Sequence, residues 1–175
     1  MIKTNEFIES YSKILESKSI KTVLDLGCGK GRISLRFARK GIKVDGVDIK
    51  DNNISTENFT FIQKDFEDFE IAKKYDLIIA SFILHFMKKE MAVELISKMK
   101  ENTQNKGFNF LICMTNLDNS FKRNPENFYP DIDLLKKLYS DWKLIKYNQD
   151  FTELEEHDNL KSHNHNVIFF LAEKR

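Results

Sequence analysis

The sequence predicts an α/β fold, namely a doubly wound, mostly parallel sheet of seven strands that ends in an antiparallel hairpin. Short apolar runs alternate with amphipathic stretches along most of the chain, which is typical of helices that cross over between parallel strands. An early apolar run leads directly into a turn with three glycines. The last two apolar runs leave no room for a helix between them, so these strands should pair antiparallel.

The length and composition fit one globular domain, residues 1–175, with its own core. The chain holds 28 basic and 27 acidic residues, so its net charge of +1 does not favour nucleic acid or a membrane surface as a partner. Cys28 and Cys113 lack metal-ligand spacing and should be reduced thiols. Residues 1–6 contain no apolar signal core, and no run reaches membrane-span length. We therefore expect a cytoplasmic monomer or homodimer.

The first part of the chain is expected to form a helix, a strand and a second helix. Residues 4–18 place their apolar side chains on one stripe, which predicts that residues 1–20 contain a helix covering the sheet. A lid over the ligand site is the alternative for this segment. Residues 23–26 indicate a buried strand, and residues 32–40 indicate a helix that stops at Gly41.

Further apolar runs predict the remaining strands. They are residues 42–48, 58–63, 75–81, 108–114, 142–151 and 167–172. Helices are expected at residues 88–103 and 131–139. Residues 115–130 are a long polar and aromatic loop at the carboxyl end of a strand. Because such loops are commonly functional, we expect a substrate wall or lid there, with a simple connection as the alternative.

The turn at Gly27, Gly29 and Gly31 is the strongest functional signal. Glycines allow a sharp turn and leave no side chain between the backbone and a ligand, and the N–H groups of the following helix favour a carboxylate or phosphate. The spacing is G-x-G-x-G, whereas dinucleotide sites prefer G-x-G-x-x-G. Asp25 is better placed for the ammonium of a methionine moiety than for a pyrophosphate. A tight turn without a ligand is the alternative.

This pattern resembles the first motif of class I S-adenosylmethionine (SAM) methyltransferases, D/E-x-G-x-G-x-G. Asp48 stands where nucleoside-binding βαβ units bind ribose hydroxyls, and Ile49 would lie near the adenine face. In this class an acid at the place of Asp65 binds the adenine amino group, with Phe66 against the ring, although a solvated acidic loop is the alternative. The expected cofactor-binding residues are Asp25, Leu26, Gly27, Cys28, Gly29, Arg32, Asp48, Ile49, Asp65, Phe66, Ser81 and Phe82.

The chain also resembles the tellurite-resistance (TehB-like) methyltransferase family from about Thr22 onward. The resemblance is carried by Asp25-Leu26-Gly27-Cys28-Gly29-Lys30-Gly31-Arg32-Ile33-Ser34-Leu35, by Tyr75-Asp76-Leu77-Ile78 with Leu84-x-Phe86, by Phe110-Leu111-Ile112, and by the pattern from Leu135 through Trp142 to Leu154. It implies a Rossmann-like fold, SAM as cofactor, S-adenosylhomocysteine as product and Arg32 as a contact of the methionine carboxylate. The family has a histidine–arginine pair where this chain has Glu155 and Glu156, and two carboxylates would repel an oxyanion.

We therefore expect an enzyme that transfers a methyl group from SAM to a small-molecule acceptor, which could be a tellurium or selenium oxyanion, a thiol or a hydroxyl. Such a transfer needs alignment and exclusion of water but no metal. His157 and His85 are the candidate bases, although a histidine among aromatics is more often a packed residue. The expected acceptor-binding residues are Tyr11, Phe86, Tyr129 and Arg123. His157, His163 and His165 raise the question of a metal, but a flexible polar connection supplies no shaped site, and none is expected.

Two other functions stay open on the sequence. Tyr139-x-x-x-Lys143 has the spacing of a short-chain dehydrogenase pair, so a NAD(P)-dependent oxidoreductase of Rossmann type is one alternative. Trp142 should begin a strand, which would keep this pair off a common helix face. The other alternative is a SAM-binding protein without catalysis. No N/D-P-P-Y/F sequence occurs, so the usual signature of methylation on the exocyclic amines of bases is missing.

Overall fold

The computed structural model describes residues 1–54, 56–65, 68–154 and 162–175. Over these residues the chain forms a seven-stranded sheet in the order β3-β2-β1-β4-β5-β7-β6. The strands are β1 (Thr22–Leu26), β2 (Lys43–Asp48), β3 (Phe59–Gln63), β4 (Tyr75–Ser81), β5 (Thr103–Met114), β6 (Lys143–Phe151) and β7 (Asn166–Glu173). The strands β1 to β5 pair in parallel, and β7 pairs antiparallel with both β5 and β6. This arrangement confirms the predicted fold class.

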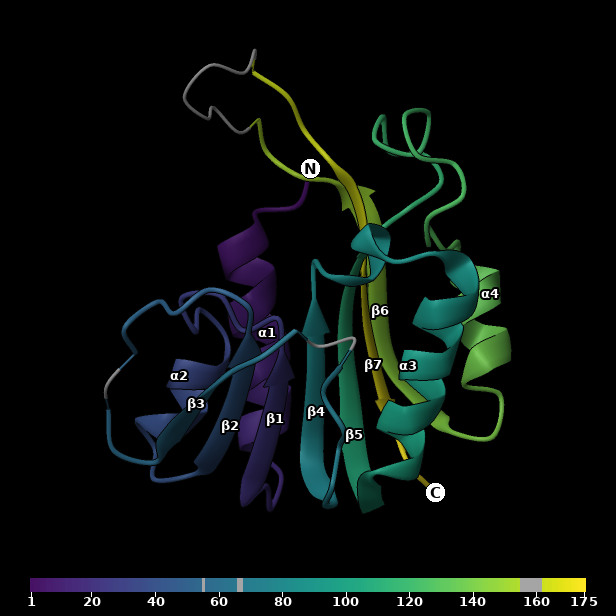
Figure 1. Ribbon diagram of the computed structural model, residues 1–175. Helices are drawn as coiled ribbons and strands as arrows, with labels where there is room; N and C mark the ends of the chain where they lie inside the picture. Colours follow the sequence, from purple (N-terminus) through teal and green to yellow (C-terminus); the bar gives the residue numbers. More distant parts are fainter. Residues whose placement is uncertain (55, 66–67, 155–161) are drawn as a thin grey trace.

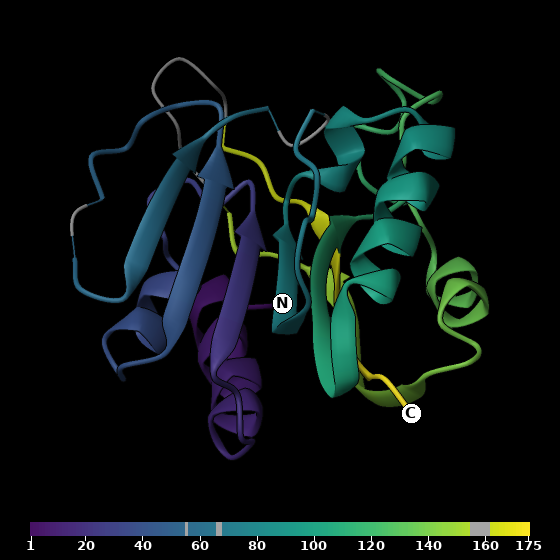
Figure 2. The same cartoon turned by 60° about the horizontal axis from the view of Figure 1, so that its bottom comes forward.

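Helices cover both faces of the sheet, as Figure 1 and Figure 2 show. They are α1 (Thr4–Glu16), α2 (Ser34–Ala38), the short 3-10 turn η1 (Leu84–Phe86), α3 (Lys89–Glu101) and α4 (Ile132–Leu138). The helices α1 and α2 pack on one face, and α3 and α4 pack on the other. None of the helices in the described part of the chain combines the length and apolar character that crossing a bilayer requires.

The strands are apolar on both sides because each face of the sheet is covered. Successive side chains of a strand point to opposite faces, so one strand contributes to two cores. In β7, Phe169 and Leu171 pack in the cluster under α1 and α2. Phe170 and Ala172 pack in the cluster under α3 and α4. A continuous apolar run in the sequence therefore corresponds to two alternating sets of core residues.

The packing of α1 corrects one predicted role. Tyr11 has no exposed surface (0%), and its ring stacks on Phe110 with 5.1 Å between ring centroids. Its hydroxyl donates to Oδ1 of Asn148 at 3.0 Å and lies 3.2 Å from the carbonyl oxygen of Phe169. The prediction that Tyr11 lines an acceptor pocket is wrong, because the apolar stripe that carries this residue is the buried side of the helix.

Several element boundaries differ from the prediction, among them the starts of α2 and β5. The helix α2 begins at Ser34 rather than at residue 32, because residues 29–33 continue the turn, with Gly31 at φ +70°. The strand β5 begins at Thr103, well before residue 108, and its pairing with β4 shifts register near the start of both strands. Neither difference moves the carboxyl ends of the parallel strands, where open α/β sheets bind ligands.

Candidate functional site

In the glycine turn between β1 and α2, Gly27 and Gly29 have different roles. Gly27 and Gly29 both lie in the left-handed region, at φ +67° and +53°. A Cβ atom at Gly27 would overlap Cγ2 of Ile83, so this glycine is needed for packing. A Cβ atom at Gly29 would meet nothing within 4 Å, so the space above this residue is open. The open side of the turn can therefore take a ligand.

Two carboxylates flank this turn. Asp25 is only 2% exposed, and its Oδ1 has no hydrogen-bond partner among the described residues. Burial raises the pKa of Asp25 to about 7; the nearby Ser34 hydroxyl opposes this shift and the charge of Asp48 adds to it. Asp48 accepts from the Gly29 N–H at 2.8 Å and from the Lys50 N–H at 3.0 Å. Each oxygen of Asp48 thus keeps a second lone pair for a ligand.

A cavity of about 280 Å³ lies beside the turn. It is lined by Asp25, Gly27, Cys28, Gly29, Lys30, Arg32, Ile33, Ser81 and Phe82. Seven of these nine are residues that the sequence predicts as cofactor contacts, while Lys30 and Ile33 were not predicted. Leu26 is fully buried, so only its backbone is left to face a ligand. Phe82 is held at φ +56°, an uncommon conformation for a residue with a side chain, and such strain is often found at functional sites.

The predicted adenine-side residues lie at the same edge of the sheet. Because β1, β2 and β3 are parallel neighbours, the segments that follow β2 and β3 start beside the glycine turn. Ile49 directly follows β2 and is 60% exposed, and Asp65 follows β3 and is half-buried. Phe66 lies outside the described residues, so its predicted contact is not placed.

The segment after β4 carries His85, three residues beyond Phe82, which lines the cavity. His85 is 8% exposed, and its Nδ1 has no hydrogen-bond partner in the described part of the chain. Its ring centroid lies 4.1 Å from that of Phe86 and 6.1 Å from that of Tyr129. Burial lowers the pKa of His85 to about 4, and a positive charge on His165 acts in the same direction. His85 is therefore a neutral ring at pH 7. The other predicted base, His157, lies outside the described residues.

Residues 115–130 fold back onto η1. The Phe128 N–H donates to the Met87 carbonyl at 2.9 Å, and Nδ2 of Asn127 donates to the His85 carbonyl at 2.9 Å. This docking buries Tyr129 to 8% exposure, whereas Phe86 stays 69% exposed. The loop thus brings Tyr129 to His85. Arg123 is exposed in the same loop.

Sequence reasoning missed a buried carboxylate–histidine pair beside His85. Oδ2 of Asp118 accepts from Nδ1 of His165 at 3.1 Å and from the Asn166 N–H at 2.8 Å, and Oδ1 accepts from the Ser120 N–H at 2.8 Å. Burial raises the pKa of Asp118, but the hydrogen bonds outweigh burial and hold the pKa at about 2. The partners come from two distant segments, so no local motif could have indicated them.

No described group of three or more His, Cys, Asp or Glu side chains converges in a way that could hold a metal ion. The imidazole rings of His163 and His165 lie next to each other, with 5.0 Å between their centroids.

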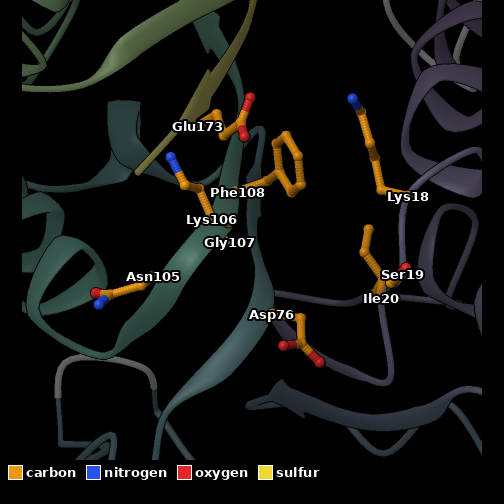
Figure 3. A pocket seen from close by; sticks show the side chains of 9 residues that line it. All are labelled: Lys18, Ser19, Ile20, Asp76, Asn105, Lys106, Gly107, Phe108 and Glu173. Atoms are coloured by element: carbon orange, nitrogen blue, oxygen red, sulfur yellow. The ribbon is translucent and has the colours of Figure 1, made fainter. Parts of the chain in front are cut away.

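A second cavity, of about 360 Å³, lies at the opposite edge of the sheet (Figure 3). It is formed by the segments before β1 and at the starts of β4 and β5, including Lys18, Asp76 and Phe108. Asp76 already accepts from the N–H groups of Lys21 and Thr22, both at 2.9 Å, so it holds the two segments together. This cavity is at the amino ends of the parallel strands, away from the glycine turn.

Comparisons with known proteins show the family to which the chain belongs. The sequence model of the family described as tellurite resistance protein TehB matches residues 2–169. The chain belongs to the TehB family. A curated relative from Haemophilus influenzae, described as a probable S-adenosyl-L-methionine-dependent methyltransferase TehB, is 31% identical over 145 residues. That match covers 78% of this chain and 51% of the relative, so the chain spans about half the length of the curated TehB proteins it matches.

Solved structures support the same conclusion about the TehB fold. The crystal structure of TehB from Haemophilus influenzae matches with a TM-score of 0.77 and 26% identity, over 97% of this chain and 62% of that one. The N-methyltransferase NodS from Bradyrhizobium japonicum matches with a TM-score of 0.72 and 14% identity, over 97% of this chain and 94% of that one. At this identity, the NodS match shows the shared fold alone. The predicted resemblance to TehB and the class I methyltransferase fold are confirmed.

Proposed function

We propose that this chain binds SAM and transfers its methyl group to a small-molecule acceptor. One observation carries the proposal, namely the orphaned buried Oδ1 of Asp25 beside the open space over Gly29, with Asp48 at the other side of the turn. The similarity to a relative described as a SAM-dependent methyltransferase supports it. The net charge of +1 is in keeping with a small acceptor rather than nucleic acid.

The residues at the turn fit SAM in their chemistry. Asp25 offers an unmet acceptor oxygen to the ammonium of the methionine moiety, and the guanidinium of Arg32, which lines the same cavity, suits its carboxylate. Asp48 has lone pairs left for ribose hydroxyls. Ile49 and Asp65 serve the adenine at the ends of β2 and β3. The remaining proposed contacts are the backbone of Leu26, Gly27, Cys28 and Gly29, the segment Ser81–Phe82, and Phe66.

Bound SAM supplies a methyl group on a cationic sulfonium, which an acceptor can take by direct displacement. The protein's own task is to fix the two partners in line and to keep water out. The side chains of Phe82, Phe86 and Tyr129 suit the exclusion of water because they are aromatic. His85 and His157 remain the proposed bases, and Arg123 and Tyr129 the proposed acceptor contacts. A tellurium or selenium oxyanion and a thiol are the acceptor classes that we propose to test.

The oxidoreductase alternative has no structural support. The hydroxyl of Tyr139 donates to Oδ1 of Asn109 at 2.9 Å, and Tyr139 is 3% exposed. Lys143 begins β6, beyond the end of α4. A buried tyrosine whose proton is already engaged cannot serve a substrate carbonyl together with that lysine.

Replacing Asp48 by alanine tests the cofactor assignment. Each lost hydrogen bond to the charged carboxylate is worth about 1.5–3 kcal/mol, so we expect Asp48→Ala to weaken SAM binding by about 100-fold or more. Isothermal calorimetry with SAM and with NADH measures this directly. Asp51→Ala, an exposed carboxylate in the following segment, is the matched control. Unchanged SAM affinity in Asp48→Ala, or tighter binding of NADH, contradicts the proposal.

A further inference from the structure

Three neighbouring strands bring ionisable side chains to one place on the sheet edge. His85 follows β4, Asp118 follows β5, and His165 directly precedes β7. Since β7 runs antiparallel to β5, its first residues lie where β4 and β5 end, as Figure 1 shows at the top of the sheet. We call these three residues and Tyr129 the histidine cluster. Phe82, three residues before His85 in the chain, lines the cavity at the glycine turn.

Within the histidine cluster, His85 is the side chain with unmet hydrogen-bonding capacity. Its Nδ1 is buried without a partner among the described residues, although buried polar atoms in proteins are nearly always paired. The docked loop keeps it in place through the Asn127 hydrogen bond to its carbonyl. A neutral imidazole has one acceptor nitrogen, so a histidine that the fold leaves without a partner at Nδ1 suits a donor group on a ligand.

The other members of the cluster set the charge that a ligand meets. Asp118 is 2% exposed, ionised, and anchored by backbone N–H groups as well as by His165. When His165 is neutral, the negative charge of Asp118 in a place of low polarity disfavours a second anion and tolerates a neutral molecule. Arg123 and Glu126 act electrostatically on the Tyr129 hydroxyl from the exposed side of the loop, with opposite signs. An already ionised oxyanion is therefore a poor match for this place.

We propose that the histidine cluster binds the methyl acceptor as a neutral protic nucleophile, a thiol or selenol, whose S–H or Se–H group donates to a ring nitrogen of His85. This inference rests on the proposed function and names its substrate class. The exposed ring of Phe86 and the ring of Tyr129 lie beside His85 and give the organic part of such a molecule an aromatic surface.

His85 takes the proton of the acceptor during the transfer. As the acceptor's sulfur forms its bond to the methyl carbon, the old carbon–sulfonium bond breaks and its electron pair stays on the sulfur that leaves. Positive charge builds on the acceptor and makes its proton far more acidic, so even a weakly basic imidazole accepts it. The products are a neutral methyl thioether, a neutral thioether from the donor, and an imidazolium that returns its proton to solvent.

A matched pair of substitutions isolates the hydrogen bond. His85→Asn keeps an acceptor oxygen near the place of Nδ1, whereas His85→Leu has a similar branch at Cγ and no acceptor. With radiolabelled SAM and benzyl mercaptan, we expect kcat/KM to fall about 100-fold or more in both variants, because neither side chain can take the proton, whereas the dissociation constant of benzyl mercaptan should rise about tenfold or more in His85→Leu and about threefold or less in His85→Asn. Calorimetry should give the same SAM affinity, within about twofold, for both variants and the unchanged protein.

Binding without turnover gives a second readout. The Cε1–H resonance of His85 is followed by NMR while benzyl mercaptan, or benzyl methyl sulfide as the probe without an S–H group, is added to the full chain. We expect the thiol to shift this resonance saturably and the sulfide to bind at least about tenfold more weakly, the equivalent of one lost hydrogen bond.

The outcomes separate the two proposals. Equal weakening of thiol binding in His85→Leu and His85→Asn, equal binding of thiol and sulfide, or methylation of selenite that His85→Leu leaves unchanged would each overturn the thiol assignment. Absence of SAM binding to the unchanged protein would overturn the proposed function instead, and the NMR titration would still decide whether the cluster binds a thiol.

Discussion

Asp25 and Asp118 are equally buried, each at 2% exposure, yet their carboxyl groups behave in opposite ways. Asp25, beside the glycine turn, has an oxygen without a partner, and burial raises its pKa to about 7. Asp118, in the histidine cluster, accepts three hydrogen bonds that outweigh burial and hold its pKa at about 2. Burial therefore dominates at Asp25, whereas hydrogen bonding outweighs burial at Asp118. The partner that Asp25 lacks is what a ligand can supply.

The two regions also differ in how the chain builds them. The glycine turn is one continuous segment whose shape depends on backbone angles at Gly27 and Gly29. The histidine cluster is assembled from side chains that follow β4 and β5 and precede β7. A change in the turn should therefore disturb backbone and packing together, whereas a change in the cluster should disturb one contact at a time.

The largest effect should come from Gly27→Ala. The new methyl group would overlap Ile83 and would force a side chain into a left-handed conformation. Together, the overlap and the left-handed conformation should lower the free energy of unfolding by about 2–5 kcal/mol. Gly29→Ala is the matched control, because it has a similar φ and open space, and it should lose about 1–2 kcal/mol. Urea denaturation measures both, and equal losses of the free energy of unfolding would contradict the different roles of Gly27 and Gly29.

The next effect should come from Asp118→Asn. The charged form of Asp118 is stabilised in the folded protein by the amount that lowers its pKa from 3.8 to about 2. Loss of the charge should therefore cost about 2–3 kcal/mol of the free energy of unfolding at pH 7. Asp25→Asn is equally buried and should cost nothing at pH 8, since its charged form is disfavoured by folding. Similar losses in both variants would remove the contrast between the two carboxyl groups.

The smallest expected effect concerns the free energy of unfolding as a function of pH, to which Asp25 and His85 contribute with opposite signs. Asp25 binds its proton more tightly when folded, so its contribution to stability is lost as pH rises from about 4 to 7. His85, whose pKa falls from 6.5 to about 4, adds stability as pH rises through the same range. Each contributes a slope of up to about 1.4 kcal/mol per pH unit.

The two slopes can be separated by denaturation at pH 4.5 and 6.5. Asp25→Asn should make the free energy of unfolding increase more steeply with pH than in the unchanged protein. His85→Leu should make it increase less steeply or fall. If both variants change the slope of the free energy of unfolding against pH in the same direction, the direction of the pKa shift is wrong for at least one of the two groups.

Much of the fold could be predicted because its signals are local. Apolar runs identify the strands, and Asp25 and the glycines that follow it identify the turn. The contacts across the chain could not be predicted in this way. Tyr11 has its hydrogen-bond partner 137 residues away in β6, and its burial contradicted the expected pocket role. The pairing of Asp118 with His165 likewise depends on the order of β5 and β7 in the sheet.

Ile83 connects the two regions, since its side chain fills the space that a residue larger than glycine would need at position 27. Two positions later the same segment presents His85. Because Gly27 and Ile83 pack closely, few substitutions should be tolerated at either position over evolutionary time. Residues 115–130 contact the segment of η1 through hydrogen bonds of Asn127 and Phe128 to the carbonyl groups of His85 and Met87. Under the proposed function, new acceptor preferences in descendants of this chain should therefore arise through substitutions in that loop, while the glycine turn stays as it is.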